Sequence, residues 1–236
     1  MTEKRRFKGF PNETVTFLIE LSQNNDKGWF DAHRQDYESY YLPPAKEFVI
    51  HLGDALRQIA PGIHAEPALN KSIFRIHRDV RFSKDKSPYK AHLAVFLWEG
   101  SRPKRMECPG FYFHLEPPNL MIGHGIHTFP KPHLEAYRKR VAQPEHGKAL
   151  SDALQQLASK KIYNFGSQRY KRLPTGYDLD YRYADLLLNK GLTVGIETLI
   201  PDELYSPELI EYCMLYYVDM APIHTWLLEM LAEMDR

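Results

Sequence analysis

Residues 110–127 read GFYFHLEPPNLMIGHGIH, and the alternation of side chains in this stretch decides the expected fold. Apolar and polar side chains alternate along Gly110–Glu116, as they do in a strand with one buried face. A second strand is expected over Leu120–His127. Only Pro117-Pro118-Asn119 separates the two, which is the length of a hairpin connection, so we expect these strands to pair antiparallel.

The same two-residue period predicts three more strands. Two precede the hairpin, at Ile73–Phe82 and Leu93–Trp98, and a weaker alternation predicts a fifth at Leu192–Leu199. The gaps between the first four strands are too short for the helix that a parallel crossover requires. The expected sheet is therefore mostly antiparallel.

Helical periodicity dominates on both sides of these strands. Helices are expected at Glu13–Ser22, along the stripe Trp29, His33, Tyr37 and Tyr41, at Pro43–Ile59, in two segments after Pro130, at Asp180–Asn189, and from Ser206 onward with an interruption at Pro222. Helices, then strands, then helices indicate an α+β fold. No linker divides the chain, so we predict a single α+β domain over residues 1–236. Its central, mostly antiparallel sheet has about five strands, with N-terminal and C-terminal helices packed on it.

Composition narrows the class of protein. The chain has 236 residues, of which 13% are aromatic, and this content argues against disorder. Its net charge of +1 and pI of about 7.8 weigh against a general nucleic-acid-binding domain. The two cysteines are too few for a disulfide framework, and neither a membrane-spanning run nor a signal peptide is evident. The expectation is a cytoplasmic protein with no membrane partner.

Positive charge is concentrated in one segment. Residues 71–92 read KSIFRIHRDVRFSKDKSPYKAH, with seven Lys or Arg against two acids, a local charge of +5. The rest of the chain therefore sums to −4. Concentrated positive charge on ordered backbone is what an anion-binding site requires.

Strand alternation sorts this segment into two faces. Arg75, Asp79 and Arg81 share one face, and we expect this set to be ordered and buried, with one of the arginines paired to Asp79. Arg78 points to the other, otherwise apolar face, which the pattern does not explain. The loop after the strand adds Lys86, Tyr89 and Lys90, and these groups suit a ligand bearing phosphate or carboxylate. The alternative is a structural ion network on the sheet face.

The hairpin carries a second signal. Tyr112, His114 and Glu116 share the face opposite to Phe111, Phe113 and Leu115. Gly123 and Gly125 alternate along the next strand, and glycines in a strand mark a close approach by a ligand or another backbone. One plausible register places them beside His114 and Tyr112. Alternatively, they only make room for the tyrosine ring.

Four histidines, His92, His114, His124 and His127, raise the question of a metal site. Neither HxH nor HExxH occurs, and the spacing of His124 and His127 on a strand directs their rings to opposite faces. Because zinc requires three or four convergent ligands, we predict no metal and no cofactor. No GxSxG, P-loop or GxGxxG motif is present, so catalytic residues stay unassigned.

The segment Arg75–Lys90 resembles the signature of a family defined by a domain of unknown function. That signature is roughly R-I-x-R-D-x-R-F-S-K-D-K-x-P-Y-K, and the chain matches it at each specified position. Gly9-Phe10, Asn24-Asn25, Trp29-Phe30 and the segment Lys171–Tyr177 are similar to its terminal motifs. The resemblance implies a single cytoplasmic α+β domain and assigns no activity or catalytic residue.

Together these patterns predict a basic, tyrosine-lined pocket for a small anionic ligand. Its expected ligand-binding residues are Arg75, Asp79, Arg81, Lys86, Tyr89, Lys90, Tyr112 and His114. Tyr89 or His114 would carry protons if a reaction occurs. One rival is nucleic-acid binding through the basic clusters Arg78–Lys90, Arg102–Arg105 and Arg169–Arg172. Another is an interaction module that dimerises through the helices from Ser206 onward.

Overall fold

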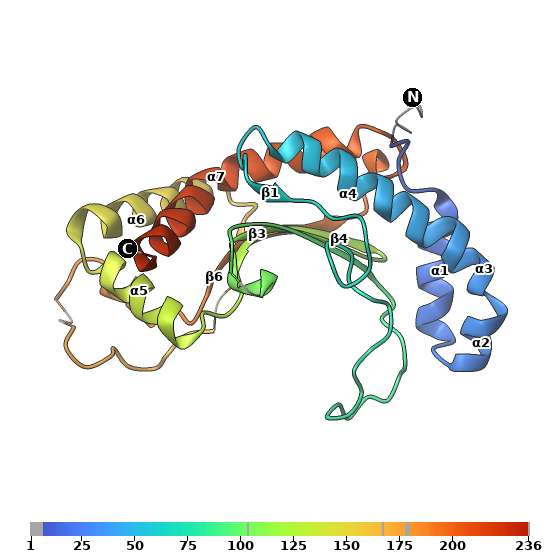
Figure 1. The fold of residues 1–236 in the computed structure, drawn as a ribbon, viewed down its shortest axis with the longest axis horizontal. Helices are drawn as coiled ribbons and strands as arrows, with labels where there is room; N and C mark the ends of the chain where they lie inside the picture. The colour runs from blue at the N-terminus through green and yellow to red at the C-terminus, as the bar shows by residue number, and fades with distance from the viewer. Residues whose placement is uncertain (1–6, 103, 167, 178–179, 236) are drawn as a thin grey trace. The chain divides into compact units, whose positions relative to one another are not determined.

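The computed structural model describes residues 7–102, 104–166, 168–177 and 180–235. Its strands form an antiparallel six-stranded sheet with the order β1-β2-β3-β4-β6-β5 (Figure 1). The predicted α+β class is confirmed. The strands are β1 (Ile63–His64), β2 (Leu93–Glu99), β3 (Gly110–Glu116), β4 (Asn119–Ile126), β5 (Asn164–Gly166) and β6 (Leu192–Leu199).

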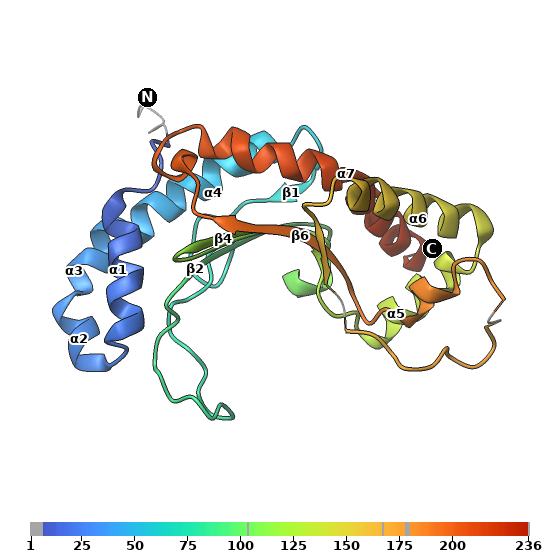
Figure 2. The same cartoon turned by 180° about the vertical axis from the view of Figure 1, so that it is seen from behind.

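Helices precede and follow the strands in the chain (Figures 1 and 2). They are α1 (Asn12–Gln23), α2 (Lys27–Ala32), α3 (Arg34–Asp36), α4 (Leu42–Leu56), α5 (Lys131–Val141), α6 (Pro144–Ser159) and α7 (Leu209–Met234). A π-helical turn occupies Tyr37–Tyr41, and short 3₁₀ helices occupy Arg105–Glu107, Ala184–Leu188 and Asp202–Tyr205. None of the helices described here has the length and apolar character that crossing a membrane requires.

The chain forms two compact units, each assembled from three separate segments. Unit 1 contains Met1–Leu97, Tyr112–Ile122 and Glu197–Leu215, and unit 2 contains Trp98–Phe111, Gly123–Ile196 and Tyr216–Arg236. Strands β2, β3, β4 and β6 thus contribute residues to both units. The single domain that the sequence predicts stays a prediction.

The core of unit 1 is rich in phenylalanine. The inward face of β3 places Phe113 against Phe48 of α4, with ring centroids 4.5 Å apart, and Phe10 stacks on Phe113 at 5.9 Å. All three side chains are fully buried. The helical spacing of apolar residues in α4 and the alternation in β3 thus meet in one cluster, as both patterns predict.

The expected second helix is interrupted. Trp29 lies on α2, His33 lies between α2 and α3, and Tyr37 and Tyr41 lie on the π-helical turn. Asp26 caps α2 by accepting a hydrogen bond from the Trp29 N–H (2.9 Å), and His33 ends it with a non-helical backbone conformation. The expected packing role is nevertheless confirmed for Tyr37 and Tyr41, which are buried.

Unit 2 packs α5 and α6 against the C-terminal half of α7 (Figures 1 and 2). The indole N–H of Trp226 on α7 donates to the His146 carbonyl on α6 (3.0 Å). Arg140 on α5 is buried, and its guanidinium pairs with both Glu229 and Glu233 of α7. Charge-assisted hydrogen bonds therefore support the apolar contacts between these helices.

Two predicted helix boundaries are wrong. Helix α7 continues through Pro222 instead of breaking there. The proline deprives the Val218 carbonyl of its helical partner, but Val218 is half exposed, so water can satisfy that oxygen. The helix expected at Asp180–Asn189 is reduced to the 3₁₀ turn Ala184–Leu188.

Candidate functional site

The basic segment is not the continuous strand that its alternation predicts. Ile73 and His77 form isolated bridges, to Val95 and Tyr89, and the residues between them belong to no strand, although the Phe74 N–H donates to the Ala94 carbonyl of β2 (3.0 Å). Two backbone hydrogen bonds of 2.8 Å, from Arg78 N–H to Pro88 O and from Lys90 N–H to Ile76 O, close the base of a loop. We call residues 77–90 the basic loop. It extends away from the strands of unit 1 (Figures 1 and 2).

The predicted buried set lies exposed. Arg81 donates to both Asp79 oxygens, from Nε at 2.9 Å and from Nη2 at 2.7 Å, while 76% of its side chain is exposed. These hydrogen bonds lower the pKa of Asp79 to about 2. Arg75 is also exposed, and Lys86 Nζ donates to the Val80 carbonyl (2.9 Å) within the loop. The expectation of burial fails because a loop without strand neighbours on both sides cannot cover these side chains.

Arg78 forms an ion pair with Asp85 across the basic loop. The Asp85 carboxylate also accepts hydrogen bonds from the Ser87 backbone N–H (2.9 Å) and hydroxyl (2.6 Å). The side chain of Arg78 is 26% exposed, so its predicted position on a core-facing strand surface is wrong. Its ion pair with Asp85 links the two sides of the basic loop.

Tyr89 anchors the basic loop to the N-terminal helices. Its ring stacks on Phe30 with centroids 4.1 Å apart, and only 5% of the residue is exposed. Asn25 holds its backbone at both ends: the side-chain amide donates to Tyr89 O, and the side-chain oxygen accepts from Tyr89 N–H, each at 3.0 Å. Burial raises the pKa of the Tyr89 phenol.

The outward face of β3 presents a hydrogen-bonded row. Tyr112 Oη lies 2.8 Å from His114 Nδ1, and His114 Nε2 lies 3.0 Å from Glu116 Oε2. Phe111, Phe113 and Leu115 on the opposite face are fully buried, as the alternation predicts. Burial raises the pKa of Tyr112 to about 12, so its hydroxyl remains protonated and able to donate.

His92 joins this row from the residue before β2. The sheet places β2 beside β3, and the hydrogen bond from Glu99 N–H to Pro109 O (3.0 Å) sets an antiparallel register. Each step back along β2 is then a step forward along β3, which brings His92 to the end that carries Glu116. The rings of His92 and His114 lie 4.3 Å apart. We call His92, Tyr112, His114 and Glu116 the histidine site.

The basic loop places the side chain of Lys90 near the histidine site. Lys90 Nζ lies 5.4 Å from the centroid of the Phe74 ring, and Phe74 meets Tyr112 edge-on at 6.3 Å. Burial lowers the pKa of His92 to about 4, and His114, Lys90 and Arg78 add to this effect while Glu116 opposes it. His92 is therefore neutral near pH 7. Of the eight predicted residues, this arrangement brings together Lys90, Tyr112 and His114.

Sequence analysis missed two members of this site. Glu116 was placed on the correct face but was not selected as a binding residue, and His92 was considered only as one histidine among four. The signal for His92 is long-range, because it depends on which strand pairs with β3. Pairing the predicted strand Leu93–Trp98 with Gly110–Glu116 would have found it.

The glycines of β4 accommodate a neighbouring backbone. Gly125 has φ +131°, and a Cβ there would overlap the Leu192 carbonyl of β6. A Cβ on Gly123 would lie 3.4 Å from the Val194 carbonyl. The close approach that the alternating glycines predict is thus confirmed, and the approaching group is strand β6.

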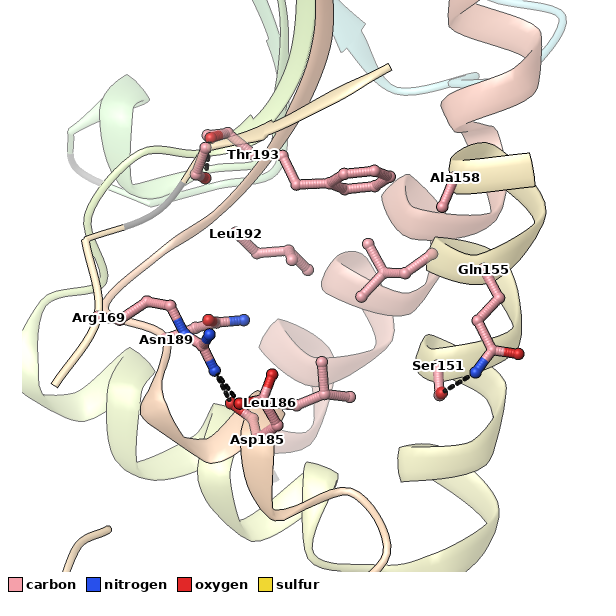
Figure 3. A pocket seen from close by; sticks show the side chains of 12 residues that line it. Ser151, Gln155, Ala158, Arg169, Asp185, Leu186, Asn189, Leu192 and Thr193 are labelled. Carbon is pink, nitrogen blue, oxygen red and sulfur yellow. Dashed lines mark hydrogen bonds and ion pairs between the residues drawn. The ribbon is translucent and has the colours of Figure 1, made fainter. Parts of the chain in front are cut away.

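Unit 2 contains a pocket of about 390 Å³ between α6, β5 and β6. Figure 3 shows Arg169 and Asp185 pointing toward one another at its edge, where Arg169 Nη2 also donates to the Asp185 carbonyl (2.7 Å). Leu154, Ala158 and Leu192 contribute apolar surface. Because its two charged side chains neutralise each other, the pocket offers no net charge to an anion.

The other predicted basic clusters also pair with carboxylates. Arg102 donates to Asp235 Oδ1 and to the Leu231 carbonyl, both at 2.8 Å, and Lys104 lies 3.3 Å from Glu107. Pro103, within the predicted basic turn, lies outside the described residues. Arg102, Lys104 and Arg169 of these clusters thus each have a carboxylate partner.

Comparison with known proteins identifies the family. A family model described as "Conserved hypothetical protein (DUF2461)" matches residues 13–226. The chain belongs to the DUF2461 family. The match includes the basic loop and the histidine site, so both are part of the family domain in this chain. No curated protein matches the chain.

Proposed function

We propose that this DUF2461 protein binds a small phosphate- or carboxylate-bearing ligand at the histidine site, beside Lys90. The observation that supports this most is the placement of a cation beside hydrogen-bonding side chains. Lys90, Phe74, Tyr112 and His114 form a continuous series of contacts, from the ammonium over Phe74 to the hydrogen bond at His114 Nδ1. A cation next to hydrogen-bond donors is suited to a compact anion.

The proposed site keeps three of the eight residues selected from sequence and adds His92. Lys90, Tyr112 and His114 are retained. Arg75, Asp79, Arg81 and Lys86 are exposed, and the last three are held by bonds within the basic loop. Tyr89 is buried against Phe30 and serves as the anchor of the loop.

Each retained group has a defined part in holding the anion. Lys90 supplies the full positive charge, and its contact with Phe74 restricts where the ammonium can lie. Tyr112 supplies a hydroxyl that stays protonated at neutral pH. A hydrogen bond to a charged group contributes about 1.5–3 kcal/mol, so losing one of these contacts should weaken binding roughly tenfold to a hundredfold.

The test is a titration with inorganic phosphate in which binding is measured from NMR chemical shifts or by calorimetry. The K90M variant should bind phosphate roughly tenfold to a hundredfold more weakly than the wild type, and Y112F should also bind more weakly. K84M is the matched control, because Lys84 is an exposed lysine of the same loop and should leave binding unchanged. Equal losses in K90M and K84M would show only a general attraction to the loop and would contradict the proposal.

Nucleic-acid binding is the second candidate, and one observation favours it. Phe82 is 96% exposed in the basic loop, where its ring is available to stack on a base. Arg78, Arg81, Arg102 and Arg169 are all paired with carboxylates, which reduces the charge available to phosphates. Oligonucleotide binding that weakens steeply with salt and is lost in F82A would favour this candidate.

We also propose a cytoplasmic location. Both cysteines, Cys108 and Cys213, are buried and unpaired. Buried free thiols are typical of proteins kept in a reducing compartment.

A further inference from the structure

Three side chains of the histidine site direct ligand atoms toward one another. Each of His92, His114 and Glu116 offers one atom, and these atoms all lie within 4.8 Å of one another. We infer that His92, His114 and Glu116 bind a divalent transition-metal ion of the zinc type. This inference departs from the sequence-based expectation of no metal, which rested on the absence of a visible set of convergent ligands.

The distances suit coordination after small side-chain rotations. Two ligand atoms, each about 2.1 Å from zinc and arranged tetrahedrally, lie roughly 3.4 Å apart. His114 Nε2 and Glu116 Oε2 are already 3.0 Å apart. Glu116 is 58% exposed at its side chain, so it can rotate without disturbing the core. A pair of imidazoles with one carboxylate is a donor set that zinc and other first-row divalent ions accept.

Tyr112 supplies the outer support that a metal-bound histidine requires. A ligating histidine usually donates its other ring N–H to an oxygen, and this fixes the tautomer and the ring orientation. Tyr112 Oη lies 2.8 Å from His114 Nδ1. With the proton on Nδ1, the Nε2 lone pair is free to bind an ion on the side of Glu116. In this row, His114 and Glu116 would therefore coordinate the ion, and Tyr112 would fix the orientation of the His114 ring.

The charges around the histidine site favour a metal ion that binds together with an anion. Lys90 and Arg78 oppose a cation at this position, and Glu116 offsets only part of that charge. An anion between Lys90 and the metal would neutralise both, so this part of the inference rests on the proposed function. Three protein ligands leave one coordination position for an oxygen of that anion.

The buried histidines of unit 2 do not form a comparable ligand set. His224 Nε2 lies 2.7 Å from Glu99 Oε2, and the His124 ring packs 4.7 Å from Phe111. Among the described residues, the group in which three possible ligand atoms lie within 4.8 Å of one another is His92, His114 and Glu116. A metal-binding signal that is lost on substitution of these residues can therefore be assigned to the histidine site.

The test uses the full chain without an affinity tag, stripped with a chelator and titrated with Zn²⁺ by calorimetry. We expect one ion per chain, with E116Q and H114Q weakening binding by more than a hundredfold. Y112F, which removes only the outer support, should weaken binding roughly tenfold to a hundredfold. H127A is the matched control, because His127 is exposed and lies outside the histidine site. Zinc affinity that is equal in the wild type, E116Q and H114Q would overturn the inference.

A Co²⁺ absorption spectrum provides a second measurement, and circular dichroism of E116Q checks that this variant folds. Wild-type protein should develop the bands of a low-coordinate Co²⁺ site, and E116Q, whose exposed side chain should permit folding, should not. Phosphate titrations of metal-free and zinc-loaded protein separate the two proposals. Zinc binding without phosphate binding would support the metal inference and contradict the proposed function. Phosphate binding without zinc binding would support the proposed function and contradict the metal inference.

Discussion

Gly125 shows how one residue fixes the spacing of two strands. Its φ of +131° is unfavourable for any residue with a Cβ, and the Leu192 carbonyl occupies the space where that atom would lie. Gly123, two positions earlier in β4, has an ordinary backbone conformation and more room. The two glycines look equivalent in the sequence, but only at Gly123 does the structure leave room for a Cβ atom.

We expect G125A to lower the free energy of unfolding by more than about 2 kcal/mol, because strain at φ and overlap with β6 add together. G123A should change it by less than about 1 kcal/mol. Urea unfolding monitored by tryptophan fluorescence measures both variants. Similar losses in the two variants would show that β6 can move away from β4 without cost.

His124 predicts a specific sensitivity to acid. The residue is 2% exposed, so its ring is almost wholly removed from water. Burial, with a contribution from nearby His224, lowers the pKa of His124 well below the ordinary value of 6.5. The unfolded chain therefore takes up a proton below that value while the folded chain does not. The neutral His124 ring therefore makes its full contribution to stability above pH 6.5, and this contribution is lost as the pH falls below that value.

Between about pH 7.5 and pH 5, the wild type should lose about 2 kcal/mol more stability than H124L, which has no imidazole at this position. Urea unfolding at a series of pH values gives the two slopes. The control H127A alters an exposed histidine and should keep the wild-type slope. Parallel slopes for the wild type and H124L would mean that His124 takes up its proton over the same pH range in the folded and the unfolded chain.

At the scale of elements, Asn25 links the basic loop to the N-terminal helices. Its side chain bonds to both the N–H and the carbonyl of Tyr89, whereas the side chain of neighbouring Asn24 donates to the Glu20 carbonyl (3.0 Å). The bonds of Asn25 join segments that are 64 residues apart in the chain. The order of the loop is therefore determined by the helices that hold Tyr89.

We expect N25A to destabilise the protein by about 1–3 kcal/mol, because it leaves two half-buried backbone groups unpaired. The loop should also exchange amide hydrogens faster, with the largest change in residues 77–90. N24A is the matched control and should leave exchange in the loop unchanged. Hydrogen exchange followed by mass spectrometry measures both variants. An unaltered loop in N25A would assign the anchoring to the Phe30–Tyr89 stack alone.

Elements with a local two-residue pattern were predictable from the sequence. The structure has β3 and β6 with the predicted bounds, Gly110–Glu116 and Leu192–Leu199. Their alternation separates buried side chains from partly or fully exposed ones, so a local pattern was sufficient. The segment Ile73–Phe82 alternates as well but lacks a continuous neighbour, and alternation alone cannot reveal that. Helix α7 continues through Pro222, and whether a helix tolerates an internal proline depends on its surroundings in the fold.

The candidate site was predictable only in part, for the same reason. The shared face of Tyr112, His114 and Glu116 follows from local alternation on β3. The positions of His92 and Lys90 follow from strand order and from the path of the basic loop. Charge counting favoured Arg75 and Arg81, but the number of positive side chains does not show which of them already have carboxylate partners.

At the scale of the whole molecule, part of the positive charge in the basic segment is paired. Three of its seven cations, Lys71, Arg78 and Arg81, pair with Glu66, Asp85 and Asp79 respectively. Asp79 and Asp85 are already counted in the net charge of +5, and Glu66, just outside the segment, lowers it by one more. The segment thus keeps a positive net charge, and Lys90 is its cation beside Phe74, next to the histidine site.

The discontinuous make-up of the two units has a consequence for synthesis on the ribosome. Unit 1 begins at the start of the chain but requires Glu197–Leu215, and unit 2 requires Tyr216–Arg236. Neither unit can be completed until these late segments have left the exit tunnel. Strands β2, β3 and β4 therefore emerge well before β6 is available to cover the edge of β4. A nascent chain of this protein passes through a period with an unprotected sheet edge, when binding by a chaperone matters most.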